Sequence, residues 1–350
     1  MSIDKEMISI GERFAVSFQR TLRVPDDGRA YPLPPGLGRF PVLQVEDYLD
    51  HVPPLWREQG GAFIPMYQRE ALWLGFHAAS WKPNAVKIAV GRINAISGEP
   101  YDEVLHSDRQ DYLVCPDQPW LDGLHTGKGS VRQFVAMPLG LGYTVEASMT
   151  GAETFGGIQI TVFEPKPGKF PDERPLTPDT GPVRSAMPKP GVLAPMGLGA
   201  GGMMKQKIYS DPYGIDAWDQ DNYGRISVHI INSAAFFEIT GLEPPPTPIA
   251  AKTYTEYGLP WFDLYDEAKS DIAPTERLAR VKTVSARDAE RGETAQTDTS
   301  VEVPESQIKR LRNNDSSRAK DHQPSSPDSA EYSPEGEQGC HHPLPKVRLY

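Results

Sequence analysis

The densest group of side chains able to do chemistry lies between residues 115 and 151. This stretch reads CPDQPWLDGLHTGKGSVRQFVAMPLGLGYTVEASMTG and places acidic, basic and aromatic residues around two glycine-rich turns. Carboxylates and an imidazole can act as general acid and base where a pocket brings them together. The candidate catalytic residues are therefore Asp122, His125 and Glu146, and the candidate ligand-binding residues are Trp120, Lys128, Arg132 and Gln133.

A structural role for the same polar residues is the competing interpretation. Arg132 and Gln133 are adjacent on an expected strand, so their side chains point to opposite faces and one of them faces the core. A buried arginine or glutamine needs a polar partner, and Glu146, expected on the next strand, is the natural one. The sequence favours such a register-holding pair over a functional pocket with Trp120 as a stacking platform.

The stretch DAWDQDNYGR resembles the start of a calcium-binding loop, because Asp219 and Asp221 stand two residues apart. A calcium loop of the helix–loop–helix type also needs an oxygen ligand at its fifth position and a glutamate at its twelfth. Counted from Asp219, these positions hold Tyr223 and Ile230. Aspartate, asparagine and glycine are equally typical of a tight turn. We therefore expect a turn beside a buried Trp218 and keep Asp219 and Asp221 only as minor metal candidates.

Other motifs of cofactor-dependent or nucleophilic enzymes are incomplete. GLHTGKGS, residues 123–130, has too few residues between its first two glycines for a nucleotide-binding loop, and a strand rather than a helix is expected after it. His106 and His125 are nineteen residues apart, and no histidine pair has the spacing that directs two imidazoles to one ion. The sequence contains no G-x-S-x-G nucleophile motif. We expect no cofactor and no bound metal.

Composition restricts the partners and the compartment. The 350 residues carry a formal charge of −11, which disfavours nucleic acid, since a phosphate backbone needs a basic face. The two cysteines, Cys115 and Cys340, are too few and too far apart for a disulfide framework, which indicates the cytoplasm or the nucleus. The start MSIDKEMISIGERF has charges where a signal peptide is apolar, and no run approaches the roughly 20 apolar residues of a membrane span. We expect a soluble, cytoplasmic protein, with KRLR at 309–312 as a minor nuclear signal.

Short β-branched and alternating runs predict a mainly β protein. The 35 prolines and 31 glycines divide the chain into short segments, which argues against a helical bundle. Turn signals recur about every 10 to 15 residues, which is typical of a sandwich or barrel. The predicted fold is a single sandwich-like or barrel-like antiparallel domain with a few short peripheral helices. The expected strands are residues 71–78, 85–96, 111–115, 131–137, 143–151, 156–165, 205–210 and 225–231.

Three short segments predict helices. VEDYLDHV, residues 45–52, ends before two prolines. Asn232 and Ser233 can cap a helix over 234–241, and Thr253 can cap another short helix.

Changes of composition divide the chain into an N-terminus, a β-rich domain and a tail. Residues 1–20 are expected to be poorly ordered, and residues 21–282 to form the domain. A proline-rich connector over 165–195 could separate two domains, but one domain containing it is favoured. Residues 283–350 contain only two aromatic residues, so they cannot bury enough apolar surface to offset the entropy of ordering. We expect them to form a disordered tail.

Several stretches resemble a family of uncharacterised bacterial and fungal proteins. They span about residues 20–285 and leave out the tail, which implies one coherent folded unit. The family has no assigned activity, so the resemblance implies nothing about chemistry. The similar stretches are YPLPPGLGRFPV (31–42), IPMYQREALWL (64–74), QPWLDGL (118–124), RQFVAMPLGLGYTVE (132–146), GGIQITVF (156–163), APMGLGAGGMMKQKIYSDPYG (194–214) and GLPWFDLYDE (258–267).

Three functional hypotheses remain open. The first is a non-enzymatic binding or assembly module, because no catalytic or metal motif is complete and aromatic residues are frequent in loop-like segments. The alternative is an enzyme that acts on a small polar or sugar-like substrate at the loop ends, for which the catalytic candidates and Arg132 must converge within hydrogen-bond reach. The third is self-assembly through exposed sheet edges. The partner would be an unknown protein, a small molecule or a second copy in a homo-oligomer; nucleic acid and membranes are not expected.

Overall fold

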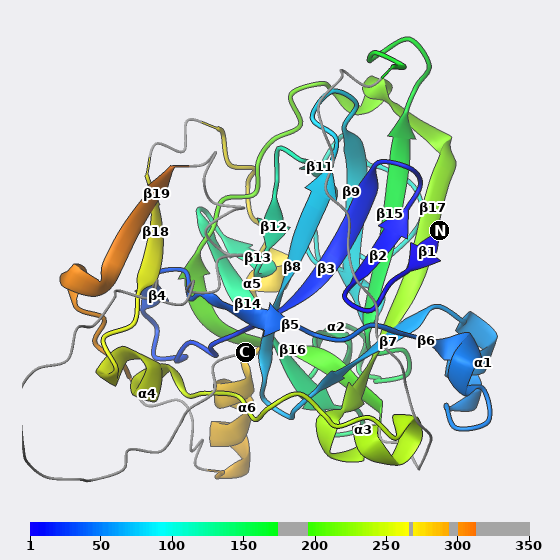
Figure 1. The fold of residues 1–350 in the computed structure, drawn as a ribbon. Coiled ribbons are helices and arrows are strands. Elements are labelled where there is room, and N and C mark those ends of the chain that lie inside the picture. The colour runs from blue at the N-terminus through cyan, green and yellow to red at the C-terminus, as the bar shows by residue number, and fades with distance from the viewer. Residues whose placement is uncertain (174–194, 266–268, 294–299, 313–350) are drawn as a thin grey trace, which may run out of the picture.

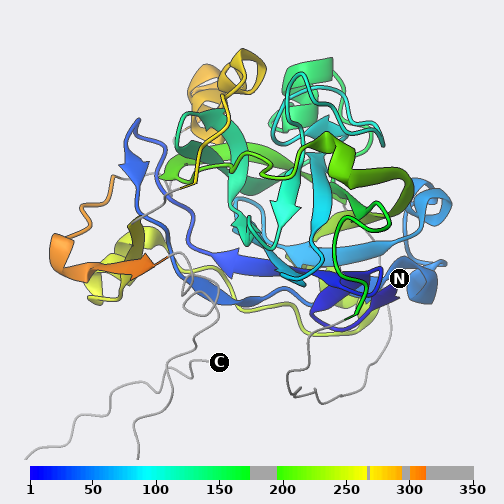
Figure 2. The ribbon, with the colours of Figure 1, turned by 90° about the horizontal axis from the view of Figure 1, so that it is seen from above.

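The molecule is built around one large, mainly antiparallel β-sheet that folds into a sandwich-like body (Figure 1). The structure, a computed structural model, describes residues 1–173, 195–265, 269–293 and 300–312. A separate two-stranded sheet stands at one edge of the body, with helix α4 (Ala251–Glu256) beside it (Figure 2). Over the described residues the large sheet does not close into a barrel, so the sandwich-like form of the predicted mainly β fold is confirmed.

Over the described residues the large sheet contains seventeen strands, and the small sheet pairs β18 (Trp261–Tyr265) with β19 (Ile308–Arg312). The first ten strands of the large sheet are β1 (Ser2–Ile3), β2 (Met7–Ile10), β3 (Phe14–Thr21), β4 (Ala30–Tyr31), β5 (Gly36–Arg39), β6 (Leu43–Gln44), β7 (Ala62–Met66), β8 (Ala71–Ala78), β9 (Asn84–Val90) and β10 (Ile93–Asn94). The remaining strands are β11 (Leu113–Cys115), β12 (Trp120–Leu121), β13 (Gly123–Gly127), β14 (Ser130–Pro138), β15 (Ile158–Pro165), β16 (Pro195–Lys205) and β17 (Trp218–Asn232).

The helices are short and lie around the sheet (Figure 2). None of those in the described segments is long and apolar enough to cross a membrane. Besides α4 they are η1 (Val45–Tyr48), α1 (Pro54–Gln59), α2 (Val145–Thr150), η2 (Ile215–Ala217), α3 (Ser233–Thr240), α5 (Glu276–Ala279), α6 (Val284–Arg291) and η3 (Glu305–Gln307).

Strand pairing brings together segments that are far apart in the sequence. β3 pairs with β8 along its whole length, from Phe14 opposite Ala78 to Thr21 opposite Ala71. β15 lies between β9 and β17, and β14 pairs with both β8 and β16. Most neighbours are antiparallel, while β4 with β16, β7 with β17 and β18 with β19 are parallel.

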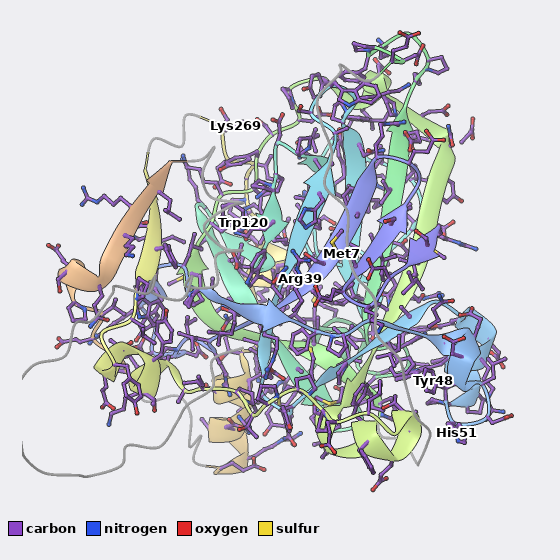
Figure 3. All side chains as sticks on the ribbon, viewed as in Figure 1. Met7, Arg39, Tyr48, His51, Trp120 and Lys269 are labelled. Atoms are coloured by element: carbon purple, nitrogen blue, oxygen red, sulfur yellow. The ribbon has the colours of Figure 1, made fainter. Side chains whose placement is uncertain are left out.

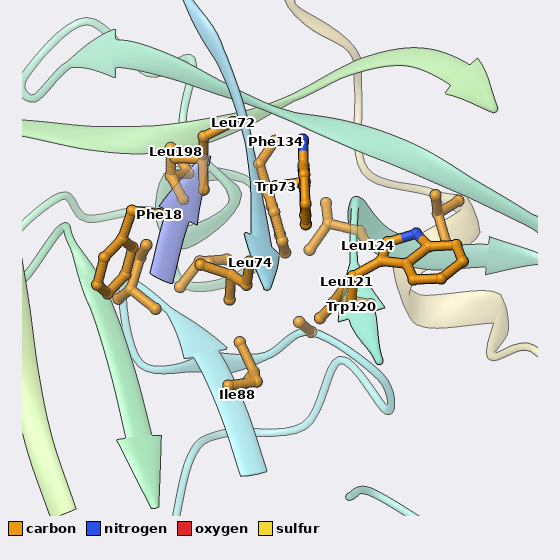
Figure 4. Close-up of a cluster of buried hydrophobic side chains, with 14 of the residues drawn as sticks. Phe18, Leu72, Trp73, Leu74, Ile88, Trp120, Leu121, Leu124, Phe134 and Leu198 are labelled. Atoms are coloured by element: carbon orange, nitrogen blue, oxygen red, sulfur yellow. The ribbon is translucent and has the colours of Figure 1, made fainter. Parts of the chain in front are cut away.

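The main core packs apolar side chains from β3, β8, β9, β14 and β16 (Figure 4). Phe18, Leu74 and Ile88 are fully buried within it. Burying one such side chain contributes about 1.5–3 kcal/mol relative to leaving it exposed. Because every residue of β9 is buried, this strand is covered on both faces.

The alternation in residues 156–165 predicts a strand with one buried face, but β15 is buried on both. Ile158 and Ile160 are fully buried, as the alternation predicts. On the opposite face Thr161 and Phe163 are fully buried as well, because Phe163 packs in a separate apolar cluster. A strand buried on both faces is thus built with polar residues as well as apolar ones.

The first 20 residues are folded, which corrects the expectation of a poorly ordered N-terminus. β2 pairs with β3 in an antiparallel hairpin. Ile8, Ile10 and Phe14 are at most 2% exposed. Gly11, at the turn, has a φ of 69°, a left-handed conformation that glycine adopts without strain. The alternation in MISIGERFAVSF carries this signal in the sequence.

Two segments of the expected C-terminal tail are also folded. α6 places Val284 in an apolar cluster with Val135 of β14. β19 pairs in parallel with β18, with Ile308 opposite Trp261. The domain therefore extends beyond the expected boundary at residue 282, because short apolar sites in a polar stretch are enough for docking.

The remaining expectations for the connector and the tail fall outside the described residues. These are the connector between 174 and 194 and the disordered tail from 313 to 350. KRLR, which the sequence offers as a nuclear-signal candidate, forms residues 309–312 of β19.

Helix α6 is held by a buried carboxylate. Asp288 is 1% exposed and accepts two hydrogen bonds of 2.7 Å from Arg69 and one of 2.7 Å from the Tyr143 hydroxyl. Burial acts to raise the pKa of Asp288, but these hydrogen bonds outweigh it and lower that pKa. The bonds thus favour the charged carboxylate in the folded state.

We expect Asp288→Ala to lower the free energy of unfolding by about 2–3 kcal/mol, because it leaves the Arg69 guanidinium and the Tyr143 hydroxyl without this acceptor. Urea denaturation measures the change. Glu290→Ala on the exposed side of α6 is the control, with an expected change below about 0.5 kcal/mol. Equal effects of the two substitutions would show that Asp288 does not hold the helix.

Two expected helices form, and one expected cap is wrong. Asn232 caps α3, since its Oδ1 accepts a hydrogen bond of 3.0 Å from the N–H of Ala234. Residues 45–52 contain the short 3₁₀ helix η1. α4 begins after Ala250, so Thr253 lies inside the helix instead of capping it.

Two expected strands differ from the structure. Residues 145–150 form α2, because the Thr144 hydroxyl accepts a hydrogen bond of 3.1 Å from the N–H of Ala147 and so caps a helix. Gly151 ends the helix in a left-handed conformation with a φ of 77°. β16 ends at Lys205, so the expected strand over 205–210 shares only its first residue with a named strand.

Candidate functional site

The expected site residues Trp120 and Asp122 are part of the interior. Trp120 is 3% exposed, and its Nε1 donates a hydrogen bond of 2.6 Å to Asp122 Oδ2. The N–H of Asp122 donates a second bond, of 2.9 Å, to Gln206 Oε1. Figure 4 shows Trp120 beside Leu121 and Leu124 in the core. Trp120 is therefore not an open stacking platform.

His125 is fully buried on β13. Neither ring nitrogen has a hydrogen-bond partner within the described part of the chain, and Asp271 Oδ1 lies 3.9 Å from Nε2. Burial lowers the pKa of His125, although the charge of Asp271 acts in the opposite direction. Asp271 itself accepts hydrogen bonds of 2.6 and 2.8 Å from the N–H groups of Gly129 and Ile208. The geometry is that of a neutral core imidazole enclosed away from solvent.

Glu146 stabilises a loop instead of meeting the other candidates. It lies in the first turn of α2 and is 3% exposed. Its carboxylate accepts hydrogen bonds of 2.8–3.2 Å from the N–H groups of residues 154–156. The predicted pairing of Glu146 with Arg132 or Gln133 across two strands is wrong, because α2 replaces one of those strands.

The other three candidates also lie apart. Arg132 contacts Asp26 at 3.1 Å. Gln133 is fully buried, and its Nε2 donates a hydrogen bond of 2.8 Å to the carbonyl of Leu22. Lys128 is exposed at the turn between β13 and β14. Arg132 and Gln133 thus join β14 to the segment after β3, as structural polar contacts do.

The stretch DAWDQDNYGR runs from the end of η2 into β17, so the expected tight turn is wrong. Residues 220–222 form a bulge in β17 relative to the paired strand β15. Asp219 Oδ1 accepts a hydrogen bond of 3.1 Å from the N–H of Asp221 within this bulge. Trp218 is fully buried, as expected. The two aspartates therefore stabilise their own backbone.

The ammonium group of a buried lysine occupies the centre of a group of side chains that could otherwise hold a metal ion. Ligand atoms of Asp102, His106 and Asp111 lie within 4.8 Å of one another, the one such group among the described residues. The Nζ atom of Lys87, which is 1% exposed, lies 2.6 Å from Asp102 and 2.8 Å from Asp111. It also donates to the carbonyl of Val104. The ammonium group supplies the positive charge here and fastens this loop to β9.

A polar pocket of about 280 Å³ lies where the end of α1 meets β15, β17 and the loop after β10. None of the predicted site residues lines it. Its lining, which defines the polar pocket, includes Glu58, Gly61, Arg92, Glu103, Gln159 and Ser227.

Arg92 presents an unpaired positive charge to the polar pocket. Its φ is 59°, a left-handed conformation that costs a non-glycine residue about 1–3 kcal/mol. The conformation is held by hydrogen bonds from its N–H to Gln159 Oε1 at 2.7 Å and from Tyr101 to its carbonyl at 2.8 Å. The guanidinium lies 4.2 Å from the centre of the Phe155 ring. Within the described segments no carboxylate lies within 4.0 Å of it.

Opposite charges cancel on a second wall of the polar pocket. Arg225 forms an ion pair with Glu103, which also accepts a hydrogen bond of 2.8 Å from the Tyr223 hydroxyl. Burial acts to raise the pKa of Glu103, but these partners and the charge of Arg92 outweigh it and lower that pKa. Tyr101 shares a hydrogen bond with Thr161. The side chains of Arg225 and Glu103 thus carry no net charge on this wall.

The end of α1 forms the third wall. Gly61 has a φ of 90°, and a Cβ at this position would lie 2.2 Å from the carbonyl oxygen of Ser227, so only glycine permits this close approach. Ser227 and Glu58 complete the wall. Glu58 is exposed and has no ion-pair partner within 4.0 Å among the residues whose positions are described.

An apolar cavity of about 240 Å³ lies elsewhere, between β1, β6, η1 and the end of α3. Ile3, Leu43, Tyr48 and Leu242 contribute to its lining. Figure 3 labels Tyr48 next to α1, and burial raises the pKa of its phenol to about 12. Charges of both signs surround this cavity, so its chemistry does not select one kind of ligand.

Comparison with models of protein families, with curated proteins and with solved structures gives no match for this chain. The function is therefore inferred from the geometry alone.

Proposed function

We propose that this protein is a non-enzymatic binding protein for a small molecule with a carboxylate group, held in the polar pocket. The observation that carries this proposal is Arg92, whose strained backbone places an unpaired guanidinium at the pocket. Strained residues concentrate at ligand sites, where the surrounding structure compensates their cost.

The planar guanidinium of Arg92 favours a carboxylate. Its central carbon lies 4.2 Å from the centre of the Phe155 ring, which is the geometry of a cation–π contact. A planar guanidinium can donate two parallel hydrogen bonds to a carboxylate. The hydroxyl of Ser227 offers a further donor in the same pocket. A volume of about 280 Å³ is at the lower end for ligand pockets and suits a small molecule.

Binding without catalysis agrees with the state of the other polar groups. Glu103 is neutralised by Arg225, and the Tyr101 hydroxyl is bonded to Thr161. The enzyme alternative requires the catalytic candidates of the sequence to converge. Asp122 and Glu146 bond to different partners, and the ring nitrogens of His125 have no hydrogen-bond partner among the described residues.

Isothermal titration calorimetry of the full chain with straight-chain monocarboxylates tests the proposal. We expect at least one acid of two to six carbons to bind at low salt. Arg92→Gln should weaken that binding about tenfold to a hundredfold, because a hydrogen bond to a charged group contributes about 1.5–3 kcal/mol.

Arg280→Gln is the matched control, because Arg280 follows directly after α5, has a side chain that is 79% exposed, and forms an ion pair only with Glu276 within the described residues. It removes one positive charge without touching the polar pocket, so the affinity should stay the same. The proposal fails if no carboxylate binds, or if the two arginine variants weaken binding equally.

A further inference from the structure

The polar pocket carries an unpaired negative charge as well as an unpaired positive one. Glu58 and Arg92 both line it, yet they do not pair with each other or with any other described side chain within 4.0 Å. The other charged groups of the lining are the ammonium of Met1 and the ion pair of Arg225 with Glu103. Glu58 and Arg92 thus face one space of about 280 Å³ without forming an ion pair with each other.

We infer that the ligand of the polar pocket is a zwitterion, with its carboxylate at Arg92 and an ammonium group at Glu58. This inference rests on the proposed function, because it assigns a second group to the same ligand. A dicarboxylate would bring like charges together at Glu58, and a simple amine would do so at Arg92. The resulting repulsion between like charges selects against dicarboxylates and simple amines as ligands.

The lining of the polar pocket also offers apolar atoms to a short methylene chain. Ile226, which is 5% exposed, and Gly61 lie in the same lining as Glu58 and Arg92. Apolar atoms there favour CH₂ groups, since burying each contributes about 0.8 kcal/mol. The ligand class is therefore a small amino carboxylate with its two charges at opposite ends.

Calorimetric titration of the full chain with three matched series tests this inference. The first series is straight-chain ω-amino carboxylates of two to six carbons, the second the same acids without the amine, and the third the same amines without the carboxylate. We expect at least one amino carboxylate to bind three- to tenfold more tightly than its matched acid.

Glu58→Gln should abolish this preference, so that each amino carboxylate binds no more tightly than its matched acid. Glu12→Gln, which removes an exposed carboxylate between β2 and β3, should retain the preference. Both substitutions change an exposed side chain, so the fold is kept.

The outcomes separate the zwitterion from the proposed function. If plain acids bind as tightly as amino carboxylates, or if the preference survives Glu58→Gln, the ligand is not a zwitterion, while carboxylate binding at Arg92 stands. If no carboxylate binds, or if Arg92→Gln has no effect on binding, both the proposed function and the zwitterion are overturned.

Discussion

Glu70→Ala is expected to lower the free energy of unfolding by about 3–5 kcal/mol, because it leaves a buried guanidinium without its counter-charge. The Nε and Nη2 atoms of Arg20 donate to Glu70 Oε1 at 2.8 and 2.5 Å, and the two side chains are 8% and 1% exposed. The other carboxylate oxygen of Glu70 accepts a hydrogen bond of 2.9 Å from the N–H of Tyr67. Urea denaturation monitored by tryptophan fluorescence measures the change.

Replacing both partners should cost less than removing one. Burial raises the pKa of Glu70 even though Arg20 lies beside it, so desolvation outweighs the attraction within the pair. We therefore expect the double variant Arg20→Met, Glu70→Leu to recover most of the stability lost in Glu70→Ala. Glu276→Ala, in an exposed pair on α5, should change it by less than about 0.5 kcal/mol. A Glu70→Ala effect as small as that would mean that the buried charge is solvated in another way.

The strands of the body were predictable because local pattern and burial agree there. Residues 131–137 and 225–231 fall within β14 and β17, whereas the expected strand over 85–96 is divided into β9 and β10 at Gly91, which has a φ of 54°. Alternation of apolar residues reports a covered face directly. It cannot report that the second face is covered too, which depends on packing by distant segments.

The ends of the domain were mispredicted because composition was averaged over long windows. The polar stretch after residue 283 contains Val284 and Ile308, which dock on the body one at a time. The helix α2 was missed although its signals are present, with Thr144 before it and Gly151 after it. Residues 143–151 carry both a strand-like pattern and the two capping residues of a helix. The caps prevail, and the segment forms α2.

The polar pocket has no local signal in the sequence. Its lining comes from segments around Glu58, Arg92, Gln159 and Ser227, which only the strand order brings together. The sequence does carry a signal for the position of the loop after β10, which contributes to the lining. Lys87 stands in the apolar strand NAVKIAV, and a lysine buried there requires carboxylate partners, which this loop provides.

Stability should also fall steeply between pH 7 and pH 4, because His229 must stay neutral in the folded state. His229 is 3% exposed, stacks on Trp56 with ring centres 4.5 Å apart, and bonds through Nε2 to the carbonyl of Gly60 at 3.1 Å. Burial lowers its pKa from 6.5 to about 4, although the bond to Gly60 acts in the opposite direction. The unfolded chain therefore binds a proton below pH 6.5 that the folded chain does not bind until about pH 4.

The contribution of neutral His229 to the free energy of unfolding is therefore complete above pH 6.5 and is lost as the pH falls toward 4. The expected loss at pH 4 is about 3 kcal/mol. Urea denaturation at several pH values from 7 to 4 measures it, and His229→Phe, which keeps a ring on Trp56, should remove most of the slope. The lowered pKa of His125 gives a residual slope of the same sign in that variant. Identical slopes in the two proteins would show that His229 is protonated without cost.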